Sequence, residues 1–334
     1  MKKIIAGFAL ACLFLSGCAS QPPAQKPMAM QYWTLTKFFS FFPDNLLSLT
    51  PEVRQKAFDD FKIMDQPSKE RVLTYLAYTL GDEQDPEIRR MTFNVIRELK
   101  AGEYIVVPLI LAYGNNNSEI ARREIKRFIM EYNPSKFDLD AIKDLLNEKK
   151  WETKLMAMEA ISMMKSKAGP ALPDITEGMC QTGPSYGIYA ECYDYAESIN
   201  KDATIASVAL DLKNKSDRIR ESALRKLNEI LKQSRVKTKE WDIAFHGIVR
   251  ALYGDDAELS SIAREMLADS ALPEAAKSVN DYDAIMSMKT AGMKDADLKK
   301  AKLEFANEET SLYKMLKEYY EKVGRDDAAK KLEE

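Results

Sequence analysis

The chain has 334 residues, of which 46% are apolar and 30% charged, with 13 glycines and 13 prolines. This balance is ordinary for a folded protein, and the well-mixed charges suit many solvent-facing helices rather than one large core. The net charge of −3 gives the chain no electrostatic footprint for nucleic acid, so we expect no nucleic-acid partner.

The first 17 residues have the pattern of an export signal. Lys2 and Lys3 precede an apolar run, Ile4–Leu15, that is too short to span a membrane comfortably. The sequence LSGC that ends at Cys18 resembles the lipobox of bacterial lipoproteins. That resemblance implies removal of residues 1–17, lipidation of Cys18 and attachment to a membrane through the lipid. It also favours the outer membrane, facing the periplasm, because no aspartate follows Cys18. The alternative is a plain secretory signal with a chance cysteine.

Two of the four cysteines remain once the signal is removed and Cys18 is lipidated. They are Cys180 and Cys192, and in an oxidising envelope compartment such a pair is usually a disulfide. Closing this short loop adds about 3 kcal/mol in the chain-entropy model. A metal or redox pair is the alternative. Two observations count against that alternative: the spacing of the two cysteines does not match CxxC, and the single histidine, His246, is far away in sequence.

A tether and an aromatic stretch follow the lipidation site. Residues 18–31 are rich in proline and glutamine, and we expect a flexible tether. Residues 32–42 then contain six aromatic side chains. They form either a segment lying on the lipid surface or a first helix covered by the rest of the fold. The second interpretation is preferred because few cationic residues accompany the aromatics.

A repeat begins at Pro51. Its amphipathic helices share a small or central residue at regular steps of 35, 32, 33, 33, 33 and 40 residues, at Ala57, Thr92, Glu124, Ala157, Ala190, Ala223 and Ala263. Shorter apolar helices and turns lie between them, and no segment has the alternation of a strand. No single helix pair could bury its apolar face, but stacked pairs make a continuous core.

The repeat resembles the short HEAT-like kind. Its motif, D/P-x-[VI]-R-x-x-A, is clearest at Pro51–Ala57, Pro86–Thr92 and Asp217–Ala223. The resemblance covers residues 50 to 270 and implies an α-solenoid. It also implies that the motif's basic residues form polar ladders between repeats; these residues are Arg54, Arg89, Lys154 and Arg220. Glu124 departs from the motif by replacing its alanine.

The predicted fold is therefore all-α, a solenoid of about seven antiparallel helix pairs over residues 32–271. Residues 272–334 form a C-terminal helical cap. Within the cap, Asp295–Lys322 reads as one long charged helix that closes the open end of the array, as end units must. Binding a partner is the alternative role for this helix.

No catalytic constellation is evident, so we expect neither an enzyme nor a cofactor. Catalysis by a triad would depend on His246, which the pattern WDIAFHGIVRAL places on a helix as a packed or surface residue. No phosphate loop or metal-binding motif is present. The methionines between Met156 and Met164 could hold Cu(I), but without accompanying histidines they are more typical of core packing.

Four tyrosines in ten residues form the candidate binding feature: Tyr186, Tyr189, Tyr193 and Tyr195. Tyrosine combines contact area with a polar tip and is enriched at protein interfaces. The pattern leaves open whether these side chains contact a partner or pack between repeats.

The expected function is that of a lipid-anchored scaffold or adaptor, which binds another envelope protein through an extended concave surface. Two alternatives remain. Some HEAT-like proteins act on bound chromophores, so the resemblance allows an enzyme or ligand-binding subunit of that lyase kind. The third reading is a structural envelope lipoprotein that associates with itself.

Overall fold

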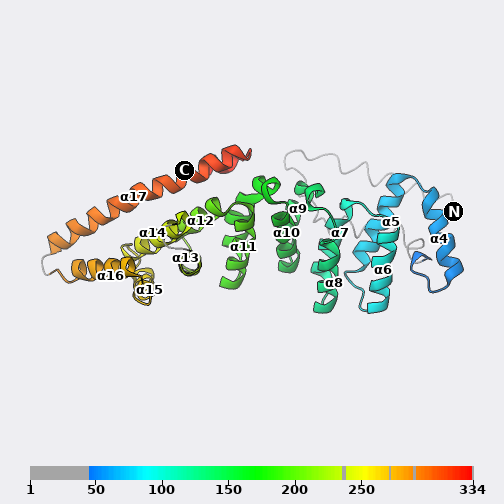
Figure 1. The fold of residues 1–334 in the computed structure, drawn as a ribbon, viewed down its shortest axis with the longest axis horizontal. Helices are drawn as coiled ribbons and strands as arrows, with labels where there is room; N and C mark the ends of the chain where they lie inside the picture. The colour runs from blue at the N-terminus through cyan, green and yellow to red at the C-terminus, as the bar shows by residue number, and fades with distance from the viewer. Residues whose placement is uncertain (1–44, 235–237, 271, 289–290, 333–334) are drawn as a thin grey trace, which may run out of the picture.

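The computed structural model describes residues 45–234, 238–270, 272–288 and 291–332. Within these ranges the regular structure is helical, with no strand, and the helices stack side by side into an elongated array (Figure 1). None of the helices in the described ranges is long and apolar enough to cross a membrane. The predicted signal, Cys18, the tether and the aromatic stretch 32–42 lie outside the described residues.

Seven helices carry the repeating motif, here called second helices: α4 (Pro51–Ile63), α6 (Pro86–Glu98), α8 (Glu119–Ile129), α10 (Trp151–Met163), α11 (Tyr186–Ile199), α13 (Asp217–Gln233) and α15 (Ala257–Ala268). Between them run the first helices, α5 (Gln66–Thr79), α7 (Val106–Asn115), α9 (Leu139–Asp144), α12 (Lys201–Leu210) and α14 (Lys239–Leu252). Short helical turns complete them: η1 (Glu103–Ile105), η2 (Pro134–Lys136), η3 (Leu145–Asn147), η4 (Lys165–Ala171), η5 (Asp174–Cys180) and η6 (Asp211–Lys213). The predicted all-α solenoid is confirmed.

The turns before four of the second helices, α6, α8, α11 and α15, supply a side-chain cap, whereas α4, α10 and α13 have none. Asp85 precedes Pro86 and accepts the Glu87 backbone N–H at 2.8 Å, so α6 starts with a capped first turn and a proline where no donor is needed. The α13 helix differs. Ser216 is its N-cap residue but makes no side-chain capping bond, and Asn214 accepts the Ser216 N–H instead.

Small residues allow neighbouring helices to approach closely. A Cβ added to Gly114 in α7 would lie 1.8 Å from Thr153 Oγ1 of α10. A Cβ on Gly247 in α14 would lie 2.8 Å from Leu227 Cδ1 of α13. Leu227 is itself fully buried. The buried apolar face of α13 therefore forms a joint between helix pairs.

Two of the four basic residues of the motif, Arg89 and Arg220, join successive repeats as the resemblance implies. Arg54 instead donates to the Ser48 carbonyl at 3.0 Å, and Lys154 lies over the Trp151 ring of its own helix. Arg89 bonds back to the carbonyl of Gln84 at 2.8 Å and across to the Glu124 carboxylate at 2.7 Å. Arg220 bonds back to the carbonyl of Asn214 at 2.9 Å and across to Asp256 at 2.7 Å. Glu124, the residue that breaks the motif, thus acts as the acceptor for the preceding repeat's arginine.

The second helices are covered unequally along the array. The motif aliphatic residue is exposed in the first three, at Val53, Ile88 and Ile120, where 40%, 37% and 60% of the residue surface is accessible. The equivalent residues Ile219 and Leu259 are buried. This motif position is therefore exposed in the first three second helices and buried in α10, α13 and α15, where it is Thr153, Ile219 and Leu259.

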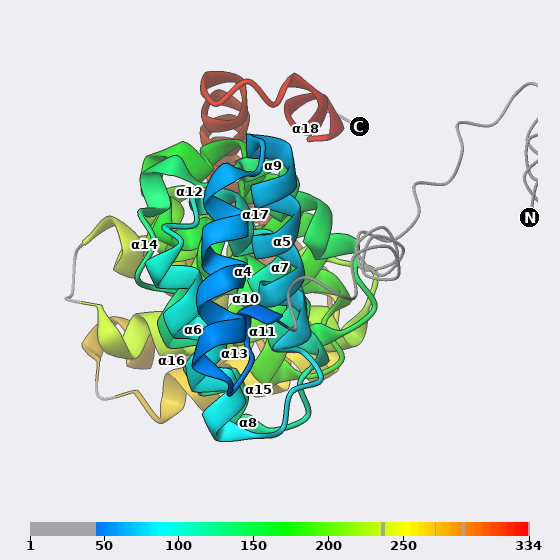
Figure 2. The same cartoon turned by 90° about the vertical axis from the view of Figure 1, so that its right-hand side faces the viewer.

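The C-terminal helices are α16 (Pro273–Met286), α17 (Ala291–Lys322) and α18 (Asp326–Lys331). α17 packs on α16 and then returns along α14 and α12 (Figure 1). Seen end-on, the end of α17 and α18 lie at the edge of the stacked helices (Figure 2). Leu316 and Tyr320, on the apolar side of α17, are both buried. Arg325 then bonds to the carbonyl of Pro170 at 2.6 Å and to Asp174 at 2.8 Å. The long helix thus covers the first helices of the C-terminal half.

Candidate functional site

Two of the four candidate tyrosines point into the core and share one carboxylate. The hydroxyls of Tyr189 and Tyr193 donate to Asp211 Oδ2 at 2.9 and 2.6 Å, and Gln181 donates to Oδ1 at 2.7 Å. The two tyrosine rings lie 4.7 Å apart between centroids. Neither tyrosine has exposed surface, so neither offers a partner anything to contact.

Burial controls the ionisation of this cluster. Asp211 is 4% exposed, and loss of hydration raises its pKa to about 6 although its three hydrogen bonds favour the charged form. Burial, followed by the negative charge of Asp211, raises the pKa values of both tyrosines well above the usual range. The cluster therefore has neutral hydroxyl donors around one carboxylate.

The other two tyrosines remain at the surface and connect repeats. Tyr186 donates to Glu229 of α13 at 2.5 Å, and Tyr195 donates to Glu191 at 3.0 Å and reaches Glu159 of α10 at 3.4 Å. Both side chains are half-buried. A partner role for the tyrosine group thus rests on these two residues and stays a prediction.

Cys180 of η5 and Cys192 of α11 are both completely buried, and the structure contains them as free thiols. Burial, followed by a hydrogen-bonding contact with Cys192, raises the pKa of the Cys180 thiol well above its usual value. The fold therefore brings the two predicted disulfide partners together. The disulfide itself stays a prediction.

The remaining sequence candidates fall into ordinary positions. His246 is exposed on α14 and lines a cavity of about 180 Å³ with Lys239 and Arg250. Met156 and Met158 are buried in α10. Among the residues that the structure describes, no group of three or more histidine, cysteine, aspartate or glutamate side chains is placed to hold a metal ion.

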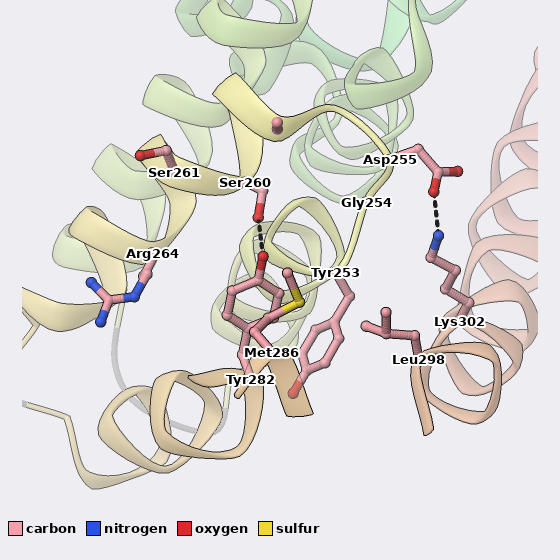
Figure 3. Close-up of a pocket in the computed structure, with 11 residues that line it drawn as sticks. Tyr253, Gly254, Asp255, Ser260, Ser261, Arg264, Tyr282, Met286, Leu298 and Lys302 are labelled. Atoms are coloured by element: carbon pink, nitrogen blue, oxygen red, sulfur yellow. Dashed lines mark hydrogen bonds and ion pairs between the residues drawn. The ribbon is translucent and has the colours of Figure 1, made fainter. Parts of the chain in front are cut away.

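A larger pocket of about 440 Å³ lies where α15 and α16 meet α17 (Figure 3), and we call it the end pocket. It is lined by Tyr253, Gly254, Asp255, Ala257, Ser260, Ser261, Arg264, Tyr282, Met286, Leu298 and Lys302. The rings of Tyr253 and Tyr282 meet edge to face at 5.3 Å. Met286 and Leu298 lie beside them, so these four side chains supply an apolar wall (Figure 3).

The polar groups of the end pocket are engaged with one another. Ser260 Oγ donates to the Leu252 carbonyl at 2.6 Å and lies 3.0 Å from the Tyr282 hydroxyl. Lys302 forms an ion pair with Asp255 across the pocket (Figure 3). Among the described residues that line it there is no histidine or cysteine. The arrangement suits reversible binding of an amphipathic group more than covalent chemistry.

Sequence reasoning missed the end pocket. Its turn at Gly254–Asp255 is visible in the sequence only as a break between helices. Leu298 and Lys302 reach the pocket because α17 folds back, and no local pattern encodes that return.

Comparisons with known proteins give no family. No family model matches the chain, and no curated protein matches it. Thirty chains of solved structures match. One is an engineered protein that is 16% identical, with 85% of this chain and 81% of that chain covered and a TM-score of 0.27. A TM-score this low does not demonstrate a shared fold. The chain is thus described as a helical-repeat protein on the strength of its own structure.

Proposed function

We propose that the protein is a lipid-anchored scaffold of the bacterial cell envelope that binds another envelope protein through its α-solenoid surface. The observation that carries this proposal is the face formed by the second helices. Ion pairs such as Arg89–Glu124 and Arg220–Asp256 tie its helices together, and it exposes the aliphatic side chains Val53, Ile88 and Ile120. A braced surface with exposed apolar residues is typical of repeat proteins that bind partners.

The HEAT-like motif and the lipobox resemblance support the rest of the proposal. The arginine of the motif, at Arg89 and Arg220, makes the inter-repeat contacts that the HEAT-like resemblance implies. Lipid on Cys18 would hold the array at the membrane, and several acyl chains anchor far more firmly than one. Metabolic labelling with an alkyne fatty acid should label the wild type and not Cys18→Ala. A labelled, membrane-bound Cys18→Ala product would contradict the anchor.

Binding by the second helices is tested by photocrosslinking in living cells. The photoreactive amino acid p-benzoylphenylalanine is placed at exposed positions of this face, one variant at a time: Asn94, Arg218 and Ser261. Asp242, exposed on first helix α14, is the matched control. We expect one heterologous adduct that recurs from the second-helix positions and is absent from Asp242.

The alternatives give different adducts. Adducts of the chain with itself alone would favour a self-associating structural lipoprotein. Absence of any adduct from all second-helix positions, with normal expression, would contradict the scaffold proposal.

The end pocket favours a second candidate, a ligand-binding subunit. Its tyrosine wall suits the apolar part of an amphipathic molecule. An acidic group on that molecule would compete with Asp283 for Arg264 and with Asp255 for Lys302. Ligand-observed NMR with a mixture of amphipathic carboxylates, on the wild type and on Tyr282→Ala, tests this candidate. A signal change that persists in the variant would count against it.

A further inference from the structure

The end of the long C-terminal helix is held closely against the first helices. The last turns of α17 pack along α12, and a Cβ on Gly169 of η4 would lie 2.8 Å from Val323 Cγ1. Arg325, at the start of α18, then binds Asp174 of η5 at 2.8 Å. We call residues 316–331 the C-terminal strap. Its seat is formed by α12, η4 and η5.

One polar atom in this contact has no partner. Tyr320 has no exposed surface, and its hydroxyl is the only buried side-chain nitrogen or oxygen in the described part of the chain that makes no hydrogen bond. Thr176 and Glu177 of η5 lie next to it. The Thr176 hydroxyl donates its proton to the Leu172 carbonyl at 3.0 Å, so towards Tyr320 it can only accept. Glu177 is therefore the neighbour whose bonding to Tyr320 can change with pH, because a carboxyl group donates only when it is protonated.

Glu177 lies where the strap meets η5. Its side chain is half-buried, and η5 is a π-helix, a rare backbone form that is frequent at functional sites. The ionisable groups that act on it come from its own and from neighbouring elements: Asp174 of η5, Asp211 of η6, Tyr320 of α17, and Arg325 and Lys331 of α18. Further groups belong to α11 and α9, which contact η5 and Asp174: Tyr189, Tyr193, Cys192 and Lys143.

These surroundings disfavour a negative charge on Glu177. Loss of hydration is the largest effect on this carboxyl, and it raises the pKa although nearby cations oppose the change. The two cations have limited influence, because Arg325 binds the carboxylates of Asp174 and Asp327 and Lys331 is exposed. Glu177 therefore holds a proton more readily under the strap than in water.

We propose that Glu177 and Tyr320 form a pH-dependent latch for the C-terminal strap. When Glu177 is neutral, its carboxyl turns toward the strap and gives the Tyr320 hydroxyl a hydrogen-bonding partner. When Glu177 is ionised, its carboxylate stays at the hydrated edge and the hydroxyl is left without a partner. Burying either group unpaired costs free energy, so the ionised state holds the strap less firmly. The latch does not depend on the proposed scaffold function.

Acid therefore tightens the strap. Because the pKa of Glu177 under the strap is raised above its ordinary value of 4.5, the stabilising contribution of this group is fully present below pH 4.5. It is lost as the pH rises through the raised value. Towards neutral and alkaline pH, the strap should open more often and uncover its seat on α12, η4 and η5.

Hydrogen exchange of the purified protein tests the latch. The measured quantity is the protection factor of residues 316–331, which compares their exchange rate with that of the unstructured chain at the same pH. Relative to α6 and α8, the wild-type strap should be about fivefold or more better protected at about pH 4.5 than at about pH 8. Equal relative protection at the two pH values would overturn the proposal.

Three conservative variants assign the effect to residues. Glu177→Gln is always neutral and should be well protected at both pH values. Tyr320→Phe has no hydroxyl to satisfy and should also lose the pH dependence. Glu197→Gln is the matched control, because Glu197 of α11 is also half-buried and burial also raises its pKa, but it lies beside Lys226 rather than the strap. The control should keep the wild-type dependence, and unchanged melting curves show that all three variants fold.

The other outcomes contradict the latch. A pH dependence that persists in Glu177→Gln would overturn it. Loss of the dependence in Glu197→Gln as well would show a general effect of charge on the array and would overturn it too. Persistence in Tyr320→Phe alone would show that Glu177 acts without the hydroxyl, and the pairing of the two residues would be wrong.

Discussion

The hydroxyl of Tyr193 lies 2.6 Å from the carboxylate of Asp211, inside a repeat that departs from the motif of its neighbours. Tyr189 and Gln181 complete the acceptor's environment. These contacts join α11, the residue that follows η5, and η6 through one polar centre. A buried carboxylate with neutral donors makes this part of the array sensitive to pH.

Asp211→Asn should change how stability depends on pH. Because the folded pKa of Asp211, about 6, is above its unfolded value, this group's stabilising contribution is fully present below pH 3.8 and is lost as pH rises through about 6. Relative to the variant, the wild type should therefore gain roughly 2 to 3 kcal/mol between pH 7 and pH 4. Urea unfolding at both pH values measures the difference, and parallel pH profiles would contradict it.

Gly114→Ala should destabilise the α7–α10 contact by about 1 to 3 kcal/mol, because its new methyl group would overlap Thr153. Gly187→Ala is the matched helical control. The only neighbour of its Cβ is Ser185 Oγ at 3.9 Å, so it should be stabilising by up to about 1 kcal/mol. Thermal unfolding followed by circular dichroism compares the two, and equal shifts would disprove the close approach.

Arg89→Met should cost about 2 to 3 kcal/mol, since it leaves Glu124 and the Gln84 carbonyl without their buried donor. The neighbouring Arg90→Met should cost less than about 0.5 kcal/mol, because its pair with Glu87 is exposed. Chemical denaturation of both variants gives the two values. If the costs are similar, the arginine ladder is not a significant source of stability.

Arg325→Gln should loosen the end of the C-terminal helix without unfolding the array. The variant loses the bonds to Asp174 and to the Pro170 carbonyl. Hydrogen exchange in the last turns of α17 and in α18 should quicken on the order of tenfold, with α6 and α8 unchanged. Lys322→Gln, at an exposed position, is the control. Unchanged exchange in both variants would show that apolar packing alone holds the helix.

The predicted Cys180–Cys192 disulfide can be tested by direct measurement. Protein isolated from an oxidising compartment should be two hydrogen masses lighter than the reduced protein and should show no reactive thiol in denaturant. Reduction should lower stability by about 3 kcal/mol. Two thiols that react only after denaturation would instead match the buried, free pair of the structure.

The periodicity of the sequence was sufficient to predict the fold class. The stripe of Ile219, Ala223 and Leu227 occupies the joint that its spacing predicts, because local amphipathicity and inter-repeat packing have the same period. The exposure of Ile88 and Ile120 could not be predicted in this way. Their exposure depends on how far the second helices separate, and the same motif is compatible with both outcomes.

The candidate sites were less predictable. Composition alone does not distinguish Tyr193, which is buried on Asp211, from Tyr195, which remains near the surface. The distinction depends on a carboxylate 18 residues further along the chain. The end pocket requires the return of α17, which is tertiary information that no repeat motif contains.

The contact between Arg325 and Asp174 also has a consequence for the order of folding. These residues are 151 positions apart, and most other contacts of a solenoid join nearby segments. The repeats from α4 to α10 can fold before the C-terminal helices have been synthesised. The surface of α12 that contacts α17 stays uncovered until α17 has been synthesised and has folded back. This late step leaves the C-terminal half open to chaperones, and to misassembly with other chains, for longest.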